Sequence, residues 1–293
     1  MTLQSPTLQT PTLQTLADAL TLTSGPEGLT CSLHGDFGNG PIAAPPEKGF
    51  PFGGLLAGLC ANALRQGLEL TAPLRSLSIQ YLAAPTYEAP IVFTPRLLRG
   101  GRTVAYTSLE VHQGERLTHH AQATYGDDDL NAVRVPGSIV PPPPLDSLDP
   151  ARTLHGPLAP RFSQHVEYRL ETGPHILQGV PGDKAGERLW MRTNDGAALD
   201  EARLCYLMDA LYPPAWTAVT TPFRAATVDL RYDFITDPTP ETAPDGLAFF
   251  EFSLVDLGGG WTMDDLIVRD GIGRILALGR QRRKLAPTRP PKA

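Results

Sequence analysis

The sequence predicts an α+β fold in which one long apolar helix followed by an antiparallel sheet occurs twice in the chain. Apolar residues recur at helical spacing in 53–70 and again in 201–212, and four β-rich segments separated by turn residues follow each helix. Such an apolar helix has to be covered, and in each half the sheet is the element available to cover it. We therefore expect two similar units, each a long helix wrapped by an antiparallel β-sheet.

Both helices have recognisable ends. Leu55, Leu59 and Ala63 are spaced for one face of the first helix, and Pro73 lies shortly beyond its end. Asp200 is expected to cap the start of the second helix, which Pro213-Pro214 should end. The expected strands lie at 74–82, 90–98, 102–113 and 116–125 in the first half and at 163–170, 187–193, 225–235, 246–257, 261–269 and 273–284 in the second.

Glycine spacing indicates that the two halves are repeats. Gly101 and Gly114 are 13 residues apart, as are Gly260 and Gly273, and a glutamine follows the second glycine eight residues later in both halves. Chance similarity between hairpins is the alternative explanation. The shared order of helix and strands favours a tandem duplication.

A proline-rich segment divides the chain. Residues 127–160 begin with three aspartates and include four consecutive prolines at 141–144, a composition typical of an extended linker. The first 14 residues carry a five-residue repeat with Pro6 and Pro11, which is incompatible with a continuous helix. We therefore expect a flexible head at 1–27, an N-terminal domain at 28–126, the linker at 127–160, a C-terminal domain at 161–285 and a basic tail at 286–293.

Composition argues against several classes of protein. The formal net charge of −6 does not favour nucleic-acid binding. The best apolar stretch, 54–64, is 11 residues long, whereas a transmembrane helix needs about 18. Three cysteines without CxxC spacing favour neither a disulfide framework nor a zinc cluster, and no secretory signal is recognisable. We expect a cytoplasmic protein that needs no metal and no cofactor.

Several short motifs occur in an order found in a known family. They are FGGL at 52–55, RGGR at 99–102, WMR at 190–192, TVD at 227–229 and RQ at 280–281. In these motifs the sequence resembles the acyl-CoA thioesterase II family and its thioesterase-like relatives.

The resemblance covers about residues 28–285 and implies a tandem double hotdog fold whose C-terminal hotdog carries the catalytic residues. It implies hydrolysis of acyl-CoA or similar acyl thioesters. The family's catalytic trio falls on Asp209 of the second helix, Thr227 of the next strand and Gln281 of the last strand.

The residues themselves bear on these three assignments. Asp209 is the one charged residue in the apolar segment 204–212, so a buried carboxylate with a raised pKa is expected; the alternative is a helix-end aspartate that faces solvent or binds a turn. Strand alternation places Gln281 on the face opposite its flanking arginines, unless it is a solvated edge residue. Thr227 alone is as consistent with a structural role as with a catalytic one.

A thioester carbonyl is electrophilic and its thiolate leaves readily, so hydrolysis needs a placed and deprotonated water. Asp209 would act as general base, while Thr227 and Gln281 orient the water. The backbone at Gly53 and Gly54 could bind the substrate's oxyanion, although glycines there would equally serve helix–sheet packing.

One working site per chain is expected. The position in the first half that corresponds to Asp209 is Gly58, so Gln122, the apparent counterpart of Gln281, has no carboxylate partner.

The main alternative is a non-catalytic double hotdog that binds acyl chains or a partner protein. Enoyl hydration is disfavoured because no histidine follows an aspartate at five residues, and no GxSxG elbow is present. We expect an acyl-CoA substrate, no membrane span and, beyond the pseudo-dimer within one chain, a possible homo-oligomer of double hotdogs. The basic tail is either solvated or a contact for the phosphates of CoA.

Overall fold

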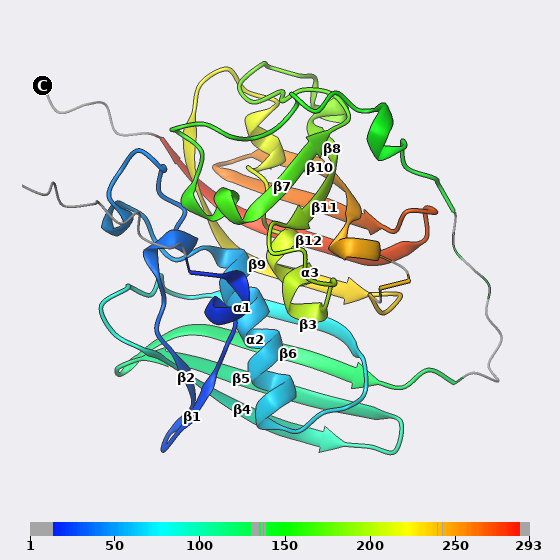
Figure 1. The fold of residues 1–293 in the computed structure, drawn as a ribbon. Coiled ribbons are helices and arrows are strands. Elements are labelled where there is room, and N and C mark those ends of the chain that lie inside the picture. Colours follow the sequence, from blue (N-terminus) through cyan, green and yellow to red (C-terminus); the bar gives the residue numbers. More distant parts are fainter. Residues whose placement is uncertain are drawn as a thin grey trace, which may run out of the picture.

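One antiparallel sheet runs through both halves of the protein and curves around two packed helices (Figure 1). No helix among the residues described is long and apolar enough to cross a membrane. The computed structural model describes residues 14–129, 135, 137, 139–238, 240–241 and 243–287.

The first half contains a short helix, a long helix and six strands in the part of the chain described. Its elements are α1 (Leu16–Ala19), β1 (Thr23–Gly25), β2 (Gly28–Cys31), α2 (Gly53–Gly67), β3 (Leu74–Tyr81), β4 (Ile91–Gly100), β5 (Val104–Gln113) and β6 (Arg116–Gly126).

The second half repeats this order around a shorter helix. Its elements are β7 (Val166–Leu170), β8 (Gly186–Thr193), α3 (Glu201–Leu207), β9 (Phe223–Phe234), β10 (Ala248–Gly258), β11 (Trp261–Arg269) and β12 (Ile275–Pro287). Short 3-10 helices lie at Gly35–Phe37, Pro46–Lys48, Leu145–Ser147, Arg161–His165, Gly182–Lys184, Pro214–Trp216 and Pro244–Gly246.

The strand order shows how the two halves are joined. Across the described residues it reads β1-β2-β4-β5-β6-β3-β9-β12-β11-β10-β8-β7, so each half mirrors the other about the contact between β3 and β9. These two strands pair antiparallel, with Ser78 opposite Arg231 and Ile79 opposite Leu230. The two sheets expected from the sequence therefore form one continuous sheet.

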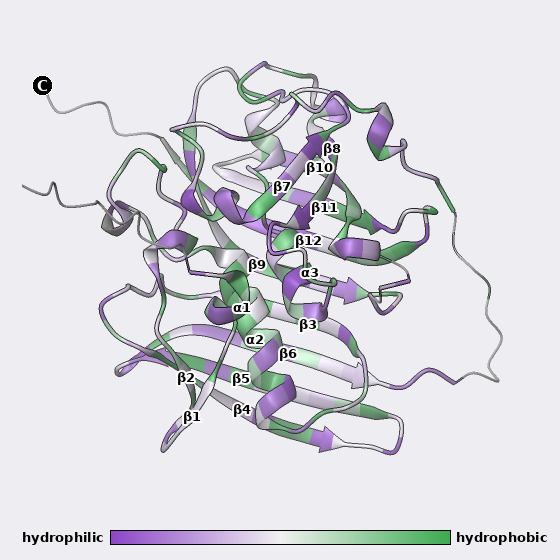
Figure 2. Cartoon of the chain, in the orientation of Figure 1, coloured by the Kyte–Doolittle hydropathy of each residue, from purple (hydrophilic) through white to green (hydrophobic). Residues whose placement is uncertain are grey.

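Helices α2 and α3 pack closely inside the curved sheet. Figure 2 shows hydrophobic residues concentrated on α2, whose Leu55, Leu59 and Leu64 are almost completely buried. A Cβ on Gly54 would lie 2.6 Å from the Tyr206 carbonyl oxygen, and one on Gly58 would lie 2.8 Å from that of Ala202. Glycine at both positions lets the backbones approach each other.

Gly58→Ala is expected to destabilise the protein, because the added methyl would overlap the α3 backbone. Overpacking of this kind typically costs about 1–3 kcal/mol, which urea denaturation would measure. Gly258→Ala is a matched control, since a Cβ there would meet nothing within 4 Å. Equal stability of the two variants would contradict this account of the helix contact.

The second helix is shorter than the predicted 201–212. It ends at Leu207, and the chain then tightens because the Ala210 amide donates to the Leu207 carbonyl and the Asp209 amide to that of Tyr206. These i to i−3 bonds replace α-helical ones. Asp209 therefore lies in the turn after α3 rather than on the helix.

The predicted flexible head, 1–27, needs correction from residue 14 onward; residues 1–13 lie outside the described residues. Thr15 caps α1, and Leu16, Leu20 and Leu22 are buried in the core. Strand β1 pairs with β2 at one edge of the sheet. The spacing of Leu16 and Leu20 places both side chains on one face of this segment, which packs into the core.

The predicted linker, 127–160, makes several contacts at its C-terminal end, although residues 130–134, 136 and 138 lie outside the described part. The Trp190 indole donates to the Pro143 carbonyl at 2.9 Å, and the Ile42 amide donates to the Ala159 carbonyl. The predicted tail, 286–293, begins as the last two residues of β12, and 288–293 are not described.

Candidate active site

The structure brings the predicted trio together from three elements. Asp209 lies in the turn after α3, Thr227 on β9 and Gln281 on β12. The Gln281 amide nitrogen donates to Asp209 Oδ1 at 2.8 Å and to Thr227 Oγ1 at 3.2 Å. Asp209 and Gln281 are only 6% and 7% exposed, while Thr227 is half-buried. The carboxylate thus faces the protein interior rather than bulk solvent.

Strand alternation explains the orientation of Gln281. Its neighbours Arg280 and Arg282 are exposed on the outer face of β12, so the amide between them points inward. The same alternation turns Arg283 inward, a consequence that the sequence analysis did not draw. The guanidinium contacts each member of the trio.

Arg283 lies between two carboxylates. Its Nη2 is 3.3 Å from Asp209 Oδ1, and its Nε donates to Asp264 Oδ2 at 2.9 Å. Its Nη1 donates to Thr227 Oγ1 at 3.1 Å, and Nη2 also donates to the Gln281 side-chain oxygen. Arg283 is therefore held by four side chains at once.

Asp264 is the second buried acid of this cluster. It lies on β11 directly opposite Gln281 of β12, and it is 4% exposed. The Thr262 hydroxyl donates to its Oδ1 at 3.1 Å. Thr262 and Asp264 alternate with the apolar Leu266 and Val268 on the inner face of β11, and this pattern could have identified the partner from the sequence.

The charges of the cluster influence one another. Burial raises the pKa of Asp209 above its usual range, although Arg283, Gln281 and the Gly54 amide act in the opposite direction. Burial likewise raises the pKa of Asp264. Burial alone would lower the pKa of Arg283, but the two carboxylates outweigh it and raise it, so the guanidinium remains charged. The site thus combines a permanent cation with two acids of reduced acidity.

The start of α2 approaches Asp209 from the first half. A Cβ on Gly53 would lie 2.8 Å from Asp209 Oδ2, so only glycine fits there without displacing the carboxylate. The Gly54 amide acts on Asp209 as well and lowers the pKa of its carboxyl. The Gly53 carbonyl accepts a hydrogen bond from the Tyr81 hydroxyl at 2.9 Å. Binding of an oxyanion by Gly53 and Gly54 stays a prediction; their observed contact is with the acid.

A small cavity of about 10 Å³ adjoins the cluster, close to the lower limit for one water molecule. Its lining includes Met208, Tyr232, Asp264, Gln281 and Arg283. Polar partners for a water are therefore available on one side of the trio.

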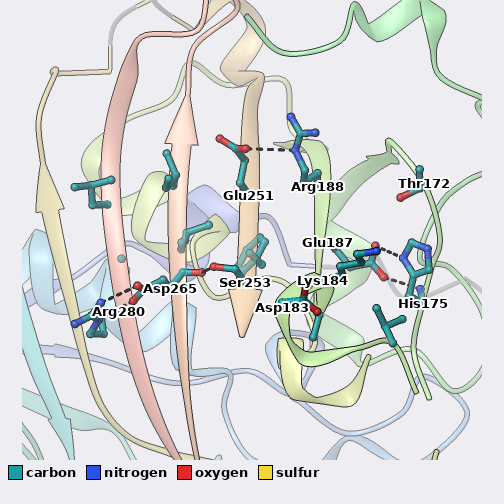
Figure 3. A pocket seen from close by; sticks show the side chains of 18 of the residues that line it. Thr172, His175, Asp183, Lys184, Glu187, Arg188, Glu251, Ser253, Asp265 and Arg280 are labelled. Atoms are coloured by element: carbon teal, nitrogen blue, oxygen red, sulfur yellow. Dashed lines mark hydrogen bonds and ion pairs between the residues drawn. The ribbon is translucent and has the colours of Figure 1, made fainter. Parts of the chain in front are cut away.

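A larger cavity of about 970 Å³ lies elsewhere in the C-terminal half (Figure 3). Outward-facing side chains of β10, β11 and β12 line it together with the segment before β8, and no member of the trio does. Several of its charged groups are paired: Figure 3 shows Arg280 with Asp265, Arg188 with Glu251, and His175 with Glu187.

The first half holds no equivalent polar cluster in its described residues. Ile79 of β3 and Leu230 of β9 lie opposite each other where the two halves meet. On the other side of these two strands, Ala121 of β6 lies opposite Ile79 and Gln281 of β12 lies opposite Leu230. Ala121 therefore corresponds to Gln281, and the exposed Gln122 does not.

The glycine spacing therefore misaligned β6 and β12 by one residue, and it also hid a difference in length between the two hairpins. Two residues separate Gln113 from Arg116, whereas five separate Arg269 from Ile275. A shift of one residue moves a side chain to the opposite face of a strand.

Comparisons with known proteins agree with this architecture. Residues 41–126 match the acyl-CoA thioesterase N-terminal domain, and residues 139–282 match the acyl-CoA thioesterase C-terminal domain. An uncharacterized protein of Mycobacterium tuberculosis, Rv0499, is 28% identical over 251 residues, which cover 78% of this chain and 84% of the relative.

Solved structures show the same fold. A hot dog protein of unknown function from Alicyclobacillus acidocaldarius superposes with a TM-score of 0.79 at 20% identity, covering 93% of this chain and 98% of the other. An acyl-CoA thioesterase II from Mycobacterium marinum superposes with a TM-score of 0.70 at 16% identity, with coverage of 93% and 98%. The fold is thus a double hotdog. The chain belongs to the acyl-CoA thioesterase family, with its N- and C-terminal domains joined in one polypeptide, and this membership supports a thioesterase function.

Proposed function

We propose that the protein hydrolyses acyl-CoA or similar acyl thioesters by direct attack of water, with Asp209 as general base. The observation that carries this proposal is the buried hydrogen-bonded group of Asp209, Gln281 and Thr227. A protein that only binds acyl chains has no need of a desolvated carboxylate bonded to an amide that also donates to a hydroxyl.

The two oxygens of Asp209 have different surroundings. Oδ1 already accepts hydrogen bonds from Gln281 and Arg283, so both of its lone pairs are used. Oδ2 faces the start of α2 at Gly53. We assign proton acceptance to Oδ2, because the lone pairs of Oδ1 are already used.

The reaction then proceeds without a covalent enzyme intermediate. Water attacks the thioester carbonyl carbon while its proton passes to Asp209, a contribution of roughly 10²–10⁴-fold. The tetrahedral intermediate expels the thiolate, and the proton held by Asp209 passes to the sulfur. The products are a carboxylic acid and a thiol, and Asp209 is again ionised.

A thiol-release assay with purified protein and a panel of acyl-CoA chain lengths tests this proposal. We expect free thiol in proportion to the acid formed, and an unchanged mass of the intact protein during turnover. Binding of acyl-CoA without thiol release at any chain length would instead favour the non-catalytic double hotdog. An acylated protein would contradict direct attack by water.

A further inference from the structure

Arg283 contacts Asp209, Thr227 and Gln281, yet the mechanism above gives it no task. Its side chain is 11% exposed, and its fourth side-chain partner, Asp264, lies outside the trio. Burying an arginine costs free energy because its charge leaves water. Ion pairs and hydrogen bonds in the interior have to offset that cost. The contacts of Arg283 with the trio are therefore expected to have a role of their own.

We propose that Arg283, anchored by Asp264, is the positioning residue that fixes the direction of the hydrogen bonds in the trio and leaves the Thr227 hydroxyl hydrogen for the substrate or the attacking water. The inference rests on the proposed thioesterase function for its chemical consequence. In structural terms, Arg283 sets the orientation of the Gln281 amide, the donor role of the Thr227 hydroxyl and the charge of Asp209.

The orientation of the Gln281 amide follows from its contact with Arg283. A guanidinium has only donors, so the group that it meets must be the carbonyl oxygen of the amide. The amide nitrogen then faces the other way, toward Asp209 and Thr227. Without Arg283 the amide could turn over and present its oxygen to the Asp209 carboxylate, which offers no hydrogen.

The direction of the Thr227 hydroxyl follows in turn. Its oxygen accepts from Gln281 Nε2 at 3.2 Å and from Arg283 Nη1 at 3.1 Å. Both acceptor positions of the hydroxyl are then used, so its hydrogen has to point away from the cluster. Thr227 is half-buried, unlike the buried Asp209 and Gln281. A hydroxyl fixed as a donor can bind the developing oxyanion or orient the water.

Asp264 keeps the guanidinium in place. It binds Nε, which leaves the two terminal nitrogens for the trio, and Thr262 holds its other oxygen. The neighbouring residues on the same two strands, Arg280 and Asp265, form a similar pair at 2.6 Å and 2.7 Å on the outer face. That pair touches no member of the trio and is therefore a natural control.

Arg283 also sets the charge that Asp209 experiences. The titratable groups that face Asp209 are Arg283 on β12, Asp264 on β11, Tyr81 on β3 and Tyr232 on β9. Burial raises the pKa of both tyrosines well above their usual range, so they are neutral at physiological pH. Arg283 is thus the cation in contact that favours the ionised base, and its removal should make Asp209 harder to ionise.

The test compares Arg283→Met, Arg283→Lys and Asp264→Asn with the outer-face controls Arg280→Met and Asp265→Asn. Thiol release gives kcat and KM from pH 5 to 10, and circular dichroism reports folding. We expect Arg283→Met to lower kcat on the order of 10²-fold with little change in KM, as for misplaced catalytic groups. The acid limb of the pH–rate profile should also shift to higher pH by about 1–3 units. Both controls should stay within about twofold of the wild type.

Arg283→Lys separates charge from geometry. A lysine keeps the positive charge and should restore most of the acid limb, but one ammonium cannot reproduce the planar fork, so kcat at high pH should remain low. Asp264→Asn should lower kcat in the same way as Arg283→Lys. Wild-type kcat in both the lysine and the asparagine variant would overturn the proposal, even if Arg283→Met does not fold.

A second readout does not require turnover. Infrared difference spectra of the Asp209 carboxyl, identified by subtraction of Asp209→Asn, give its titration in the wild type and in Arg283→Lys or Arg283→Met. A higher titration point in Arg283→Met supports the positioning role even if the wild type hydrolyses no thioester, in which case the proposed function alone would fail. An unchanged titration point would overturn the electrostatic part of the inference.

Discussion

Asp209→Asn is expected to lower kcat for thioester hydrolysis by about 10²–10⁴-fold, because asparagine cannot accept the proton of the attacking water. The remaining amide oxygen can still accept from Gln281 and Arg283, as Asp209 Oδ1 does. The burial that raises the pKa of Asp209 also places the acid limb of the wild-type profile above the usual carboxyl range. Thiol release as a function of pH measures both effects.

The fold should survive this substitution. A carboxyl whose folded pKa is raised loses stabilising free energy as the pH rises through that pKa, so the neutral amide removes a penalty present at neutral pH. We expect a cooperative thermal transition at or above that of the wild type. Asp265→Asn, on the outer face of the same strand as Asp264, is the control. A rate near that of the wild type would exclude Asp209 as the base.

His119→Phe is expected to flatten the dependence of stability on pH. His119 is 1% exposed and lies edge-on to Tyr81 with ring centroids 4.9 Å apart. Its Nδ1 is 3.0 Å from the Thr118 hydroxyl, while its Nε2 has no hydrogen-bond partner. Burial lowers its pKa to about 4 from 6.5, so the ring is neutral in the folded protein.

The sign of the effect follows from proton binding. Above pH 6.5 the ring is neutral in both states, and the folded protein has its full stability. Between pH 6.5 and 4 the unfolded chain binds a proton that the folded protein excludes, so stability falls with pH by up to about 3 kcal/mol. Urea denaturation between pH 4 and 8 should show this loss in the wild type and not in His119→Phe, with pH 8 as the reference. Parallel curves for the two proteins would contradict this explanation.

Much of the fold was predictable because its signals are local. The strands expected at 74–82 and 261–269 are observed as Leu74–Tyr81 and Trp261–Arg269, and α2 begins at the expected Gly53. The end of α3 was missed because a 3-10 turn, set by tertiary packing, precedes Pro213.

The candidate site was predictable only in part. The family resemblance pointed to Asp209 and Gln281, and a lone acid among apolar residues and an alternating strand favoured inward positions for both; the structure brings them to 2.8 Å. Arg283 and Asp264 were missed because charged residues are normally assigned to solvent, and only their pairing across β11 and β12 makes an inward position tolerable.

The contact of the Gly54 amide with Asp209 means that one repeat supplies the backbone against which the acid of the other repeat rests. In a dimer of identical chains, every substitution would appear twice, and loss of the acid would abolish both sites. Fusion removes that constraint, since Gly58 can specialise in helix contact while Asp209 keeps its carboxylate. If Asp209 is the base, as proposed, such a protein can change the repeat that lacks the acid without altering the cluster around Asp209.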